Sequence, residues 1–357
     1  MAMGLEGLGF DGGWAATAAE VSGGLPDARV ARVVAVDRHG GWVHDGEREV
    51  PFEPAGRLCF TAAAPGDLPS VGDWVLARYH DQGQAAIVHA VLPRRTLLGR
   101  KEAGKGTYLQ VIAANVDVAF IVQSCHYDLN LRRLDRYLVM VREGGITPVL
   151  VLTKTDLVGR DDLLGLLAQI DAAGLQVTVI AVSNATGEGV DRFRESLEPG
   201  RTYVLVGSSG VGKSTLINQM TTPTRQMTRE VSHTGEGVHT TVRRQLIRLD
   251  QGAMLVDTPG MREFGILASE AGVVDAFSDI EAWAATCRYA DCRHGQEPGC
   301  AVRAAVINGE LGEERLQHFL KLRREAGFHE LSELERRRRG RAFGRMVKNA
   351  KKRRDGG

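Results

Sequence analysis

Long apolar stretches are absent from this chain of 357 residues. No segment approaches the roughly 18 to 20 consecutive apolar residues that a membrane-spanning helix needs. The opening residues, MAMGLEGLGFDGGW, also lack the basic stretch followed by an apolar one that marks a secretory signal. The sequence therefore predicts a cytoplasmic protein that does not associate with membranes.

Cysteine is scarce, with five residues in the whole chain. An odd number of cysteines in a cytoplasmic protein argues against a framework of disulfide bonds. Cys59 and Cys125 stand alone in the sequence, and we expect both to be buried apolar side chains. The other three lie close together, which points to a different use.

A strong net charge is also missing, because 45 basic residues nearly balance 44 acidic ones. The net charge of +1 argues weakly against a nucleic-acid partner, but it hides an asymmetry. Residues 336–357 carry eleven Lys or Arg and a single acid, Asp355, so the rest of the chain is acidic. The dense arginines, with Phe343 and Met346 between them, favour contact with RNA phosphates over a merely solvated tail.

The composition allows a sizeable core, since 43% of residues are hydrophobic, and the length suits two or three domains. Residues 1–27, rich in Gly and Ala, are predicted to be a loose N-terminal extension. In residues 28–100, short apolar runs alternate with turn residues: ARVVAV, GWVHD, RLCF, GDWVLARY and AAIVHAVL. This pattern predicts a barrel of about five strands, similar to an OB-fold, and then a linker that contains Gly104 and Gly106.

Residues 111–270 have a different texture, in which near-continuous apolar runs alternate with helical patterns. The runs are VDVAFIV (116–122), TPVLVL (147–152), VTVIAV (177–182), TYVLVG (202–207), RQLIRL (244–249) and AMLVD (253–257). Such runs suit strands that are buried on both faces of a largely parallel sheet. With LRRLDRYLVMVREG and DDLLGLLAQIDAAG as helices between them, they predict a doubly wound α/β domain. Residues 271–357 are predicted to form a helical domain that contains the clustered cysteines and ends in a basic helix.

A phosphate-binding motif, G-x-x-x-x-G-K-[ST], spans residues 207–214, directly after a predicted strand and before a helical stretch. Such a loop directs backbone N–H groups toward phosphate oxygens, and the helix N-terminus adds its dipole. Lys213 would supply positive charge to the terminal phosphates, and Ser214 a hydroxyl ligand for Mg²⁺. The predicted nucleotide contacts in this loop are Gly207, Ser208, Ser209, Gly210, Val211, Gly212, Lys213, Ser214 and Thr215.

Two motifs for the base follow other predicted strands. Thr153-Lys-Thr-Asp156 resembles the guanine motif [NT]-K-x-D, in which Asp156 accepts two guanine N–H groups that adenine does not offer. The Lys154 stem would lie over the base. Ser183 and Asn184 resemble the loop whose backbone N–H meets the guanine carbonyl, a contact that does not depend on the Asn184 side chain.

The order of these motifs is unusual. The stretch Asp257-Thr-Pro-Gly260 ends a predicted strand and resembles a GTPase switch, with a carboxylate for Mg²⁺ at Asp257 and a backbone N–H for the γ-phosphate at Gly260. In ordinary GTPases the phosphate loop comes first, whereas here Asp156 and Ser183 precede Gly207. The chain is therefore interpreted as a circularly permuted GTPase, and a permutation leaves the site intact when the old termini lie close together.

Beyond the switch lies the pattern Cys287-x4-Cys292-x-His294-x5-Cys300. Three thiolates and an imidazole at this spacing indicate a closed, tetrahedral structural zinc site with one Zn²⁺ per chain. Four protein ligands leave no open position, so a catalytic zinc is not expected.

The barrel, the permuted motifs and the Cys/His pattern together resemble the ribosome small-subunit-dependent GTPase A family (RsgA, also called YjeQ or EngC), over about residues 30–355. Gly237-Val-His239-Thr240-Thr241 matches the switch-one pattern G-x-H-T-T of that family. The resemblance implies that Thr240 or Thr241 reaches Mg²⁺. It also implies a catalytic role for His239, because Met261 stands where many GTPases have a water-orienting Gln.

The family resemblance implies an enzyme that binds GTP and GDP with Mg²⁺ and acts in late maturation of the small (30S) ribosomal subunit. It implies that the subunit stimulates hydrolysis and that the barrel contacts 16S rRNA. We expect a monomer. Two alternatives stay open: a permuted GTPase that acts on the large subunit, and an RNA-binding assembly placeholder whose nucleotide only sets its conformation. A third, an ATP-dependent P-loop protein, is disfavoured by Asp156.

Overall fold

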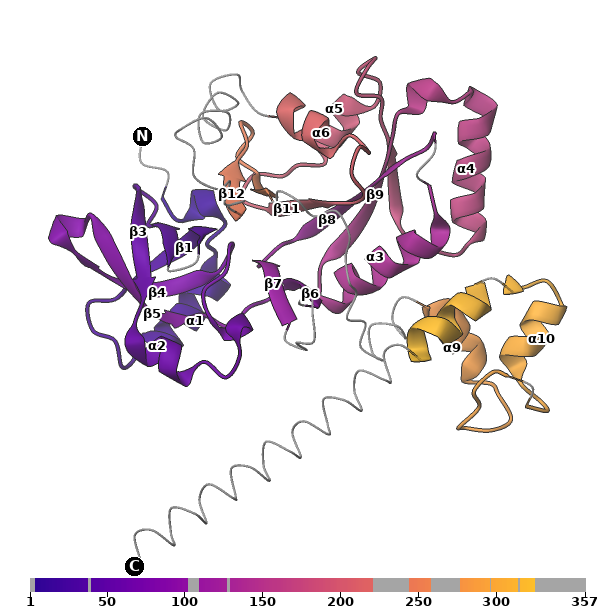
Figure 1. Cartoon of the computed structure of the whole chain (residues 1–357), viewed down its shortest axis with the longest axis horizontal. Helices are drawn as coiled ribbons and strands as arrows, with labels where there is room; N and C mark the ends of the chain where they lie inside the picture. Colours follow the sequence, from indigo (N-terminus) through magenta and orange to yellow (C-terminus); the bar gives the residue numbers. More distant parts are fainter. Residues whose placement is uncertain are drawn as a thin grey trace, which may run out of the picture. The chain divides into compact units, whose positions relative to one another are not determined.

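Figure 1 shows the fold as a computed structural model. The structure describes residues 4–37, 40–101, 109–126, 129–220, 244–257, 277–295, 297–313 and 315–324. The chain separates into two compact units, unit 1 (Met1–Ile266) and unit 2 (Leu267–Gly357). Among the described helices, none combines the length and the apolar character that crossing a bilayer requires.

Five strands form the barrel in unit 1: β1 (Arg29–Val36), β2 (Gly41–His44), β3 (Glu49–Pro54), β4 (Trp74–His80) and β5 (Ala85–Val91). They pair in the order β1-β2-β3-β5-β4, and β4 returns to pair with β1, so the barrel closes as in an OB-fold. The interior is filled by small and β-branched side chains and one aromatic, Phe52. The predicted five-stranded barrel is therefore confirmed.

One of the predicted barrel strands was wrong. The RLCF run forms helix α2 (Gly56–Thr61), which has no buried residue and leaves 90% of Phe60 exposed. Cys59 is likewise exposed, whereas Cys125 is buried as expected. The missing strand is β3, whose sequence EVPFEP contains two prolines and two glutamates, and only Val50 and Phe52 face the interior. Short 3-10 helices η2 (Pro65–Asp67) and η3 (Asp81–Gly83) lie in the barrel connections.

The N-terminal extension is folded rather than loose, which corrects the sequence prediction. It contains the 3-10 helix η1 (Glu6–Leu8) and helix α1 (Gly12–Ser22), and the Asp11 carboxylate caps α1 by accepting the Trp14 N–H at 2.8 Å. The rings of Phe10 and Trp14 lie 5.0 Å and 6.1 Å from the ring of Trp74 in β4. These aromatic contacts fix the extension on the barrel, although its Gly and Ala content gave little sign of a helix.

The predicted linker contains a two-stranded antiparallel sheet, β6 (Leu97–Lys101) and β7 (Leu109–Ala114). Gly104 and Gly106 lie outside the described residues. The chain then enters the α/β layer through Asn115, whose backbone has a φ of +55°. Asn is one of the few residues other than Gly that adopts this left-handed conformation at small cost.

Six strands form the α/β layer: β8 (Val118–Ser124), β9 (Thr147–Thr153), β10 (Thr178–Ala181), β11 (Thr202–Val206), β12 (Arg244–Arg248) and β13 (Met254–Asp257). Their order is β10-β9-β8-β11-β13-β12, and only β12 runs antiparallel to its neighbour in this layer. One face packs on α3 (Leu131–Glu143) and α4 (Arg160–Ala172), the other on α5 (Val190–Glu195) and α6 (Lys213–Gln219). The predicted doubly wound layer is confirmed (Figure 1).

The barrel and the α/β layer share one sheet within unit 1. Strand β1 of the barrel pairs antiparallel with β12 of the α/β layer, with Ala35 opposite Gln245 and Val36 opposite Arg244. One apolar cluster also extends from Trp74 at the barrel to Leu138 of α3. The two parts are therefore joined by both hydrogen bonds and a common core.

Unit 2 contains α9 (Ser278–Ala284), α10 (Ala301–Ile307) and a further helical segment, residues 315–324. Its small core is built around Phe277 and Phe319, whose ring centroids lie 5.5 Å apart. Arg315 and Asp279 form an ion pair at 2.7 Å between the last segment and α9. The cysteine-bearing loops connect α9 to α10.

Candidate nucleotide and metal sites

The phosphate loop lies between the end of β11 and the start of α6. Its backbone requires glycine, because φ is +148° at Gly207, +77° at Gly210 and +98° at Gly212. A Cβ atom on Gly207 would also lie only 2.2 Å from the Val122 carbonyl oxygen. The Lys213 Nζ donates a hydrogen bond to the Gly207 carbonyl at 2.7 Å, so the side chain folds back over the loop. A cradle of this shape is suited to phosphate.

Both predicted base loops bond to the phosphate loop. The Thr153 hydroxyl donates to the carbonyl of Val211 at 2.6 Å, and the Asn184 side-chain amide donates to the carbonyl of Gly212 at 3.3 Å. From α6, the Gln219 side-chain amide donates to the Asn184 carbonyl at 3.2 Å. The two base loops are thus bonded to consecutive carbonyl groups of the phosphate loop. These bonds fix the distance between the base loops and the phosphate loop before any nucleotide binds.

Asp156 is an exposed carboxylate whose orientation is set by a buried neighbour. The Ser183 hydroxyl donates to Asp156 Oδ1 at 2.5 Å, and its oxygen accepts from the backbone N–H groups of Ala185 and Thr186 at 3.2 Å and 3.1 Å. Lys154 precedes the short helix η4 (Thr155–Leu157) with a φ of +59°. The structure therefore brings Thr153, Lys154, Asp156, Ser183 and Asn184 together at the carboxyl ends of β9 and β10, beside the phosphate loop.

Asp257, the predicted switch carboxylate, ends β13, which is the strand next to β11. Because Val204 pairs with Val256, the ends of the two strands lie at the same edge of the sheet. Ser214 and Thr215 are exposed in the first turn of α6. The other predicted contacts, Gly260, His239, Thr240 and Thr241, lie outside the described residues, and so does Met261.

Sequence reasoning missed two side chains at this site. It treated Asn184 as a backbone contact only, and it did not single out Gln219. The available signal was Asn184 itself, because a polar side chain stands where related loops usually have Ala. A motif records which residues occur at a position, but the bond from this amide to Gly212 depends on the folded approach of two loops.

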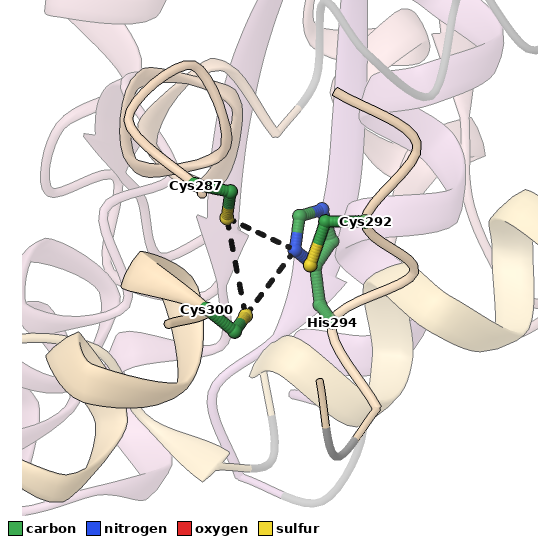
Figure 2. Close-up of side chains that lie close together, drawn as sticks. All are labelled: Cys287, Cys292, His294 and Cys300. Atoms are coloured by element: carbon green, nitrogen blue, oxygen red, sulfur yellow. Dashed lines mark hydrogen bonds between the residues drawn. The ribbon is translucent and has the colours of Figure 1, made fainter. Parts of the chain in front are cut away.

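The metal cluster in unit 2 consists of Cys287, Cys292, His294 and Cys300, whose ligand atoms all lie within 4.8 Å of one another (Figure 2). The Cys287 Sγ lies 3.7 Å from His294 Nδ1 and 3.9 Å from Cys300 Sγ, and the latter two atoms are 3.6 Å apart. A tetrahedral zinc ion with Zn–S bonds of about 2.3 Å and a Zn–N bond of about 2.0 Å separates its ligands by roughly 3.5 to 3.8 Å. The distances among Cys287, His294 and Cys300, and the donor set of all four residues, therefore fit zinc, with Nδ1 as the His294 ligand.

Local structure holds the ligands in place. His294 has a left-handed backbone with a φ of +58°, and the Arg303 guanidinium donates to its carbonyl at 3.2 Å and to that of Gly295 at 2.9 Å. Glu297 braces the same turn by accepting from the Gly295 N–H at 2.7 Å. Cys300 is the N-cap of α10, and its sulfur accepts from the Arg303 N–H at 3.4 Å. Left-handed backbone is costly for residues other than Gly, so its presence here shows that the turn is strongly constrained.

The surroundings of the cluster shift the pKa values of its ligands in different directions. Burial and the nearby charge of Arg323 lower the pKa of His294, which favours the neutral imidazole that metals bind. Burial acts against ionisation of Cys287, but hydrogen bonds from the backbone N–H groups of Val302 and Ala301, together with those from the Cys292 and Cys300 side chains, lower the pKa of that thiol. Burial raises the pKa of Cys292 to about 11, so this thiol needs the metal charge to become a thiolate.

The strand order and the motif order together define a class of protein. The phosphate loop follows β11 in the middle of the sheet, while the base loops follow strands that come earlier in the chain. A P-loop fold with this connectivity is a circularly permuted GTPase, and here it is joined to an OB-like barrel and a Cys₃His module.

Known proteins place the chain within one family. Residues 91–267 match the family model "RsgA GTPase". A relative from Opitutus terrae named "Small ribosomal subunit biogenesis GTPase RsgA" is 40% identical over 308 residues, which cover 84% of this chain and 83% of that protein. A relative of the same name from Xanthomonas axonopodis pv. citri is 44% identical over 303 residues, covering 84% and 81%. This chain belongs to the RsgA GTPase family.

Solved structures agree with this assignment. The crystal structure of YjeQ from Thermotoga maritima matches with a TM-score of 0.64 and 26% sequence identity, covering 84% of this chain and 98% of that one. The structure of YloQ, described as a circularly permuted GTPase, matches with a TM-score of 0.60 at 23% identity, covering 85% and 97%, and supports the fold.

Proposed function

We propose that this protein hydrolyses GTP during late maturation of the small ribosomal subunit, and that the subunit stimulates the reaction. One observation carries the guanine preference: an exposed Asp156 carboxylate is oriented by the buried Ser183, beside a phosphate loop to which both base loops are bonded. The assignment to the small subunit rests on the family, because relatives at 40% identity or more are named for the biogenesis of that subunit.

The predicted site residues have separate proposed parts in nucleotide binding. Asp156 accepts the two guanine N–H groups, and the Asn184 backbone N–H donates to the guanine carbonyl. The amides of residues 207–215 and the Lys213 ammonium bind the phosphates. Ser214 and Asp257 are proposed ligands for Mg²⁺, completed by Thr240 or Thr241, and the ion would neutralise charge that develops on the phosphates. We assign GTP and GDP as the bound nucleotides.

His239 is proposed to orient or deprotonate the attacking water. Met261 has no group that could hydrogen-bond the water, and His239 adjoins the threonines assigned to Mg²⁺ in the sequence. Imidazole is the side chain most often used for proton transfer near neutral pH.

The partners follow from the modular organisation. We propose that residues 28–100 form an RNA-binding barrel, that residues 111–270 form the GTPase and that residues 271–357 form the zinc-binding domain, which holds one Zn²⁺ per chain. Barrel and basic arm (336–357) would contact 16S rRNA, and the eleven cationic side chains of the arm predict salt-sensitive binding. The protein is proposed to be a cytoplasmic monomer.

The base assignment is tested by changing the base partner. Asp156→Asn should weaken GTP binding and shift preference toward xanthosine triphosphate, because the amide can donate to the xanthine carbonyl where the carboxylate accepted from guanine. Competition against a fluorescent GDP analogue measures the affinities for GTP and xanthosine triphosphate. ATP serves as the control for a site that has lost all selectivity for the base. An unchanged preference for GTP in the variant would remove Asp156 from the base site.

A further inference from the structure

A buried arginine connects four separate segments of unit 1. The Arg32 side chain in β1 is only 2% exposed, and its three nitrogens bond to groups far apart in the chain. Its Nε donates to the Gly72 carbonyl at 3.4 Å, and Nη1 donates to the Leu8 carbonyl of the N-terminal extension. Its Nη2 donates to the Asn115 carbonyl at 3.3 Å and to the Thr202 hydroxyl at 2.7 Å. One guanidinium thus ties the barrel to the entrance of the α/β layer.

The charge of Arg32 is not compensated by a direct ion pair within the described residues. Burial lowers its pKa to about 10, while the more distant carboxylates of Asp117 and Asp73 oppose this shift. The guanidinium also lies 5.1 Å from the centroid of the Trp74 ring. A buried cation that relies on oxygens of several segments is stable only while those segments keep their relative positions. The contact is therefore sensitive to any movement of β1.

The contacts of Arg32 fall at the starts of two strands whose far ends form the nucleotide site. Thr202 is the first residue of β11, and Met254, whose sulfur lies 3.3 Å from Arg32 Nη1, is the first of β13. Five residues after Thr202 the chain reaches Gly207 of the phosphate loop, and β13 ends at Asp257. Strand β11 is buried along its whole length and β13 up to Asp257, so a shift at the start of either strand would be carried through packed backbone to the site.

Strand β1 makes a second connection to the α/β layer through its own backbone. A few residues beyond Arg32, β1 pairs with β12 through Ala35 opposite Gln245. Strand β12 in turn pairs with β13, with the same Gln245 opposite Asp257. One barrel strand therefore reaches the predicted Mg²⁺ carboxylate by two routes, through Arg32 and through a continuous ladder.

We infer that Arg32 is a positioning residue for GTP hydrolysis, which couples the state of the barrel to the phosphate loop and to Asp257 through β11, β12 and β13. Because coupling between two sites is reciprocal, the bound nucleotide must also alter the barrel. The inference rests on the proposed binding and hydrolysis of GTP, and it does not depend on which RNA occupies the barrel.

Hydrogen exchange in the full-length protein tests the coupling without a ribosome. Peptides from β1 and β4 should exchange at different rates when GDP is replaced by a non-hydrolysable GTP analogue, by roughly fivefold or more. Thr202→Val removes only the hydroxyl that Arg32 reaches and should abolish this difference in the barrel, with nucleotide affinity unchanged. Thr202→Ser keeps the hydroxyl and should retain it. Arg32→Gln is a more disruptive variant, because it leaves several buried oxygen atoms without a hydrogen-bond donor. It is therefore expected to destabilise unit 1.

Turnover gives a second readout that a purely structural role would not change. With saturating GTP and small subunits, Thr202→Val should bind the subunit and keep its basal rate but lose roughly fivefold or more of the stimulated kcat. Equal barrel exchange with both nucleotides in the wild type, or full stimulation in Thr202→Val, would overturn the inference and leave the GTPase assignment standing. A wild-type protein that binds no GTP would overturn both.

Discussion

At the scale of single residues, Asn184 gains a role that its motif does not predict. Its side-chain amide bonds to Gly212 of the phosphate loop, and Gln219 holds its carbonyl. The amide therefore sets the distance between the base pocket and the phosphates. A bound nucleotide must contact the base pocket and the phosphate loop at the same time. A correct distance that is fixed beforehand reduces the entropy lost in ordering the site on binding.

Removing this bond should weaken the binding of GTP and GDP alike. Asn184→Ala loses one side-chain hydrogen bond of about 1 kcal/mol, which corresponds to roughly a fivefold loss of affinity. Asn184→Asp should bind more weakly still, because a carboxylate oxygen would face the Gly212 carbonyl. Titration calorimetry with GDP measures the effect, and Asn308→Ala, an exposed asparagine in unit 2, is the matched control. Equal affinity of Asn184→Ala and Asn308→Ala would contradict the role assigned to this amide.

His239 is expected to act on the chemical step rather than on binding. His239→Ala should leave GTP affinity nearly intact and reduce subunit-stimulated turnover by roughly 10²-fold, which is the scale of general acid–base catalysis. Single-turnover hydrolysis with saturating small subunits separates the two effects. If the variant binds the subunit normally and hydrolyses GTP at the stimulated rate, then His239 has no catalytic part.

Residue-level prediction is most direct where the residues of a motif are neighbours in the sequence. Lys213, Asp156 and Ser183 occur in short patterns whose spacing follows from a strand and the turn after it, and the structure places all three at one edge of the sheet. Arg32 gave no such signal. It stands in an ordinary apolar strand, and its partners at Leu8 and Thr202 are remote in the sequence.

At the scale of elements, apolar runs predicted the six strands of the α/β layer, and the signal is clearest for β8 and β11, which are buried along their whole length. The same signal failed in the barrel. RLCF has the composition of a strand but lies on an exposed helix. EVPFEP alternates between exposed and buried residues, but its two prolines argue against a strand, and β3 was missed. The prediction of a loose N-terminal extension failed for another reason. Its helix depends on the aromatic contact of Trp14 with Trp74, which no local pattern reveals.

The packing of the extension makes a direct prediction about stability. Trp14 is 4% exposed, so Trp14→Ala should destabilise unit 1 by about 3 to 5 kcal/mol through the cavity it leaves. Phe60→Ala is the control, because this aromatic is 90% exposed and its loss should cost almost nothing. Urea unfolding followed by intrinsic fluorescence measures both. A loss in Trp14→Ala no larger than that in Phe60→Ala would show that the extension does not pack on the barrel.

The zinc module makes a prediction of its own. Cys292→Ser removes one of four ligands, and the variant should lose the ion and expose unit 2 to proteolysis, since small zinc modules depend on their metal for folding. Elemental analysis of freshly purified protein should find about one zinc per chain in the wild type and in Cys59→Ser, whose thiol is exposed and outside the cluster. Wild-type protein that is free of zinc when purified without chelators would contradict the assignment.

At the scale of the whole molecule, the sequence revealed the modules but not how the first two are joined. A barrel of about five strands, a permuted GTPase and a Cys₃His pattern are indicated by local runs and motifs, although one strand of the barrel was misassigned. The ladder between β1 and β12 is not, because it connects residues more than two hundred positions apart. Within unit 1 the barrel and the nucleotide site consequently share a sheet. This is the connection through which we propose that an RNA contact alters hydrolysis.

The most direct test of the account is GTP turnover by the purified full-length protein, measured alone, with small subunits and with large subunits. The account predicts slow hydrolysis by the free protein and a strong, saturable acceleration by small subunits only. Acceleration by large subunits instead would favour the alternative, in which the protein acts on the large subunit. A rate that neither subunit changes, despite tight binding of GTP, would contradict the central claim and favour a placeholder whose nucleotide only sets its conformation.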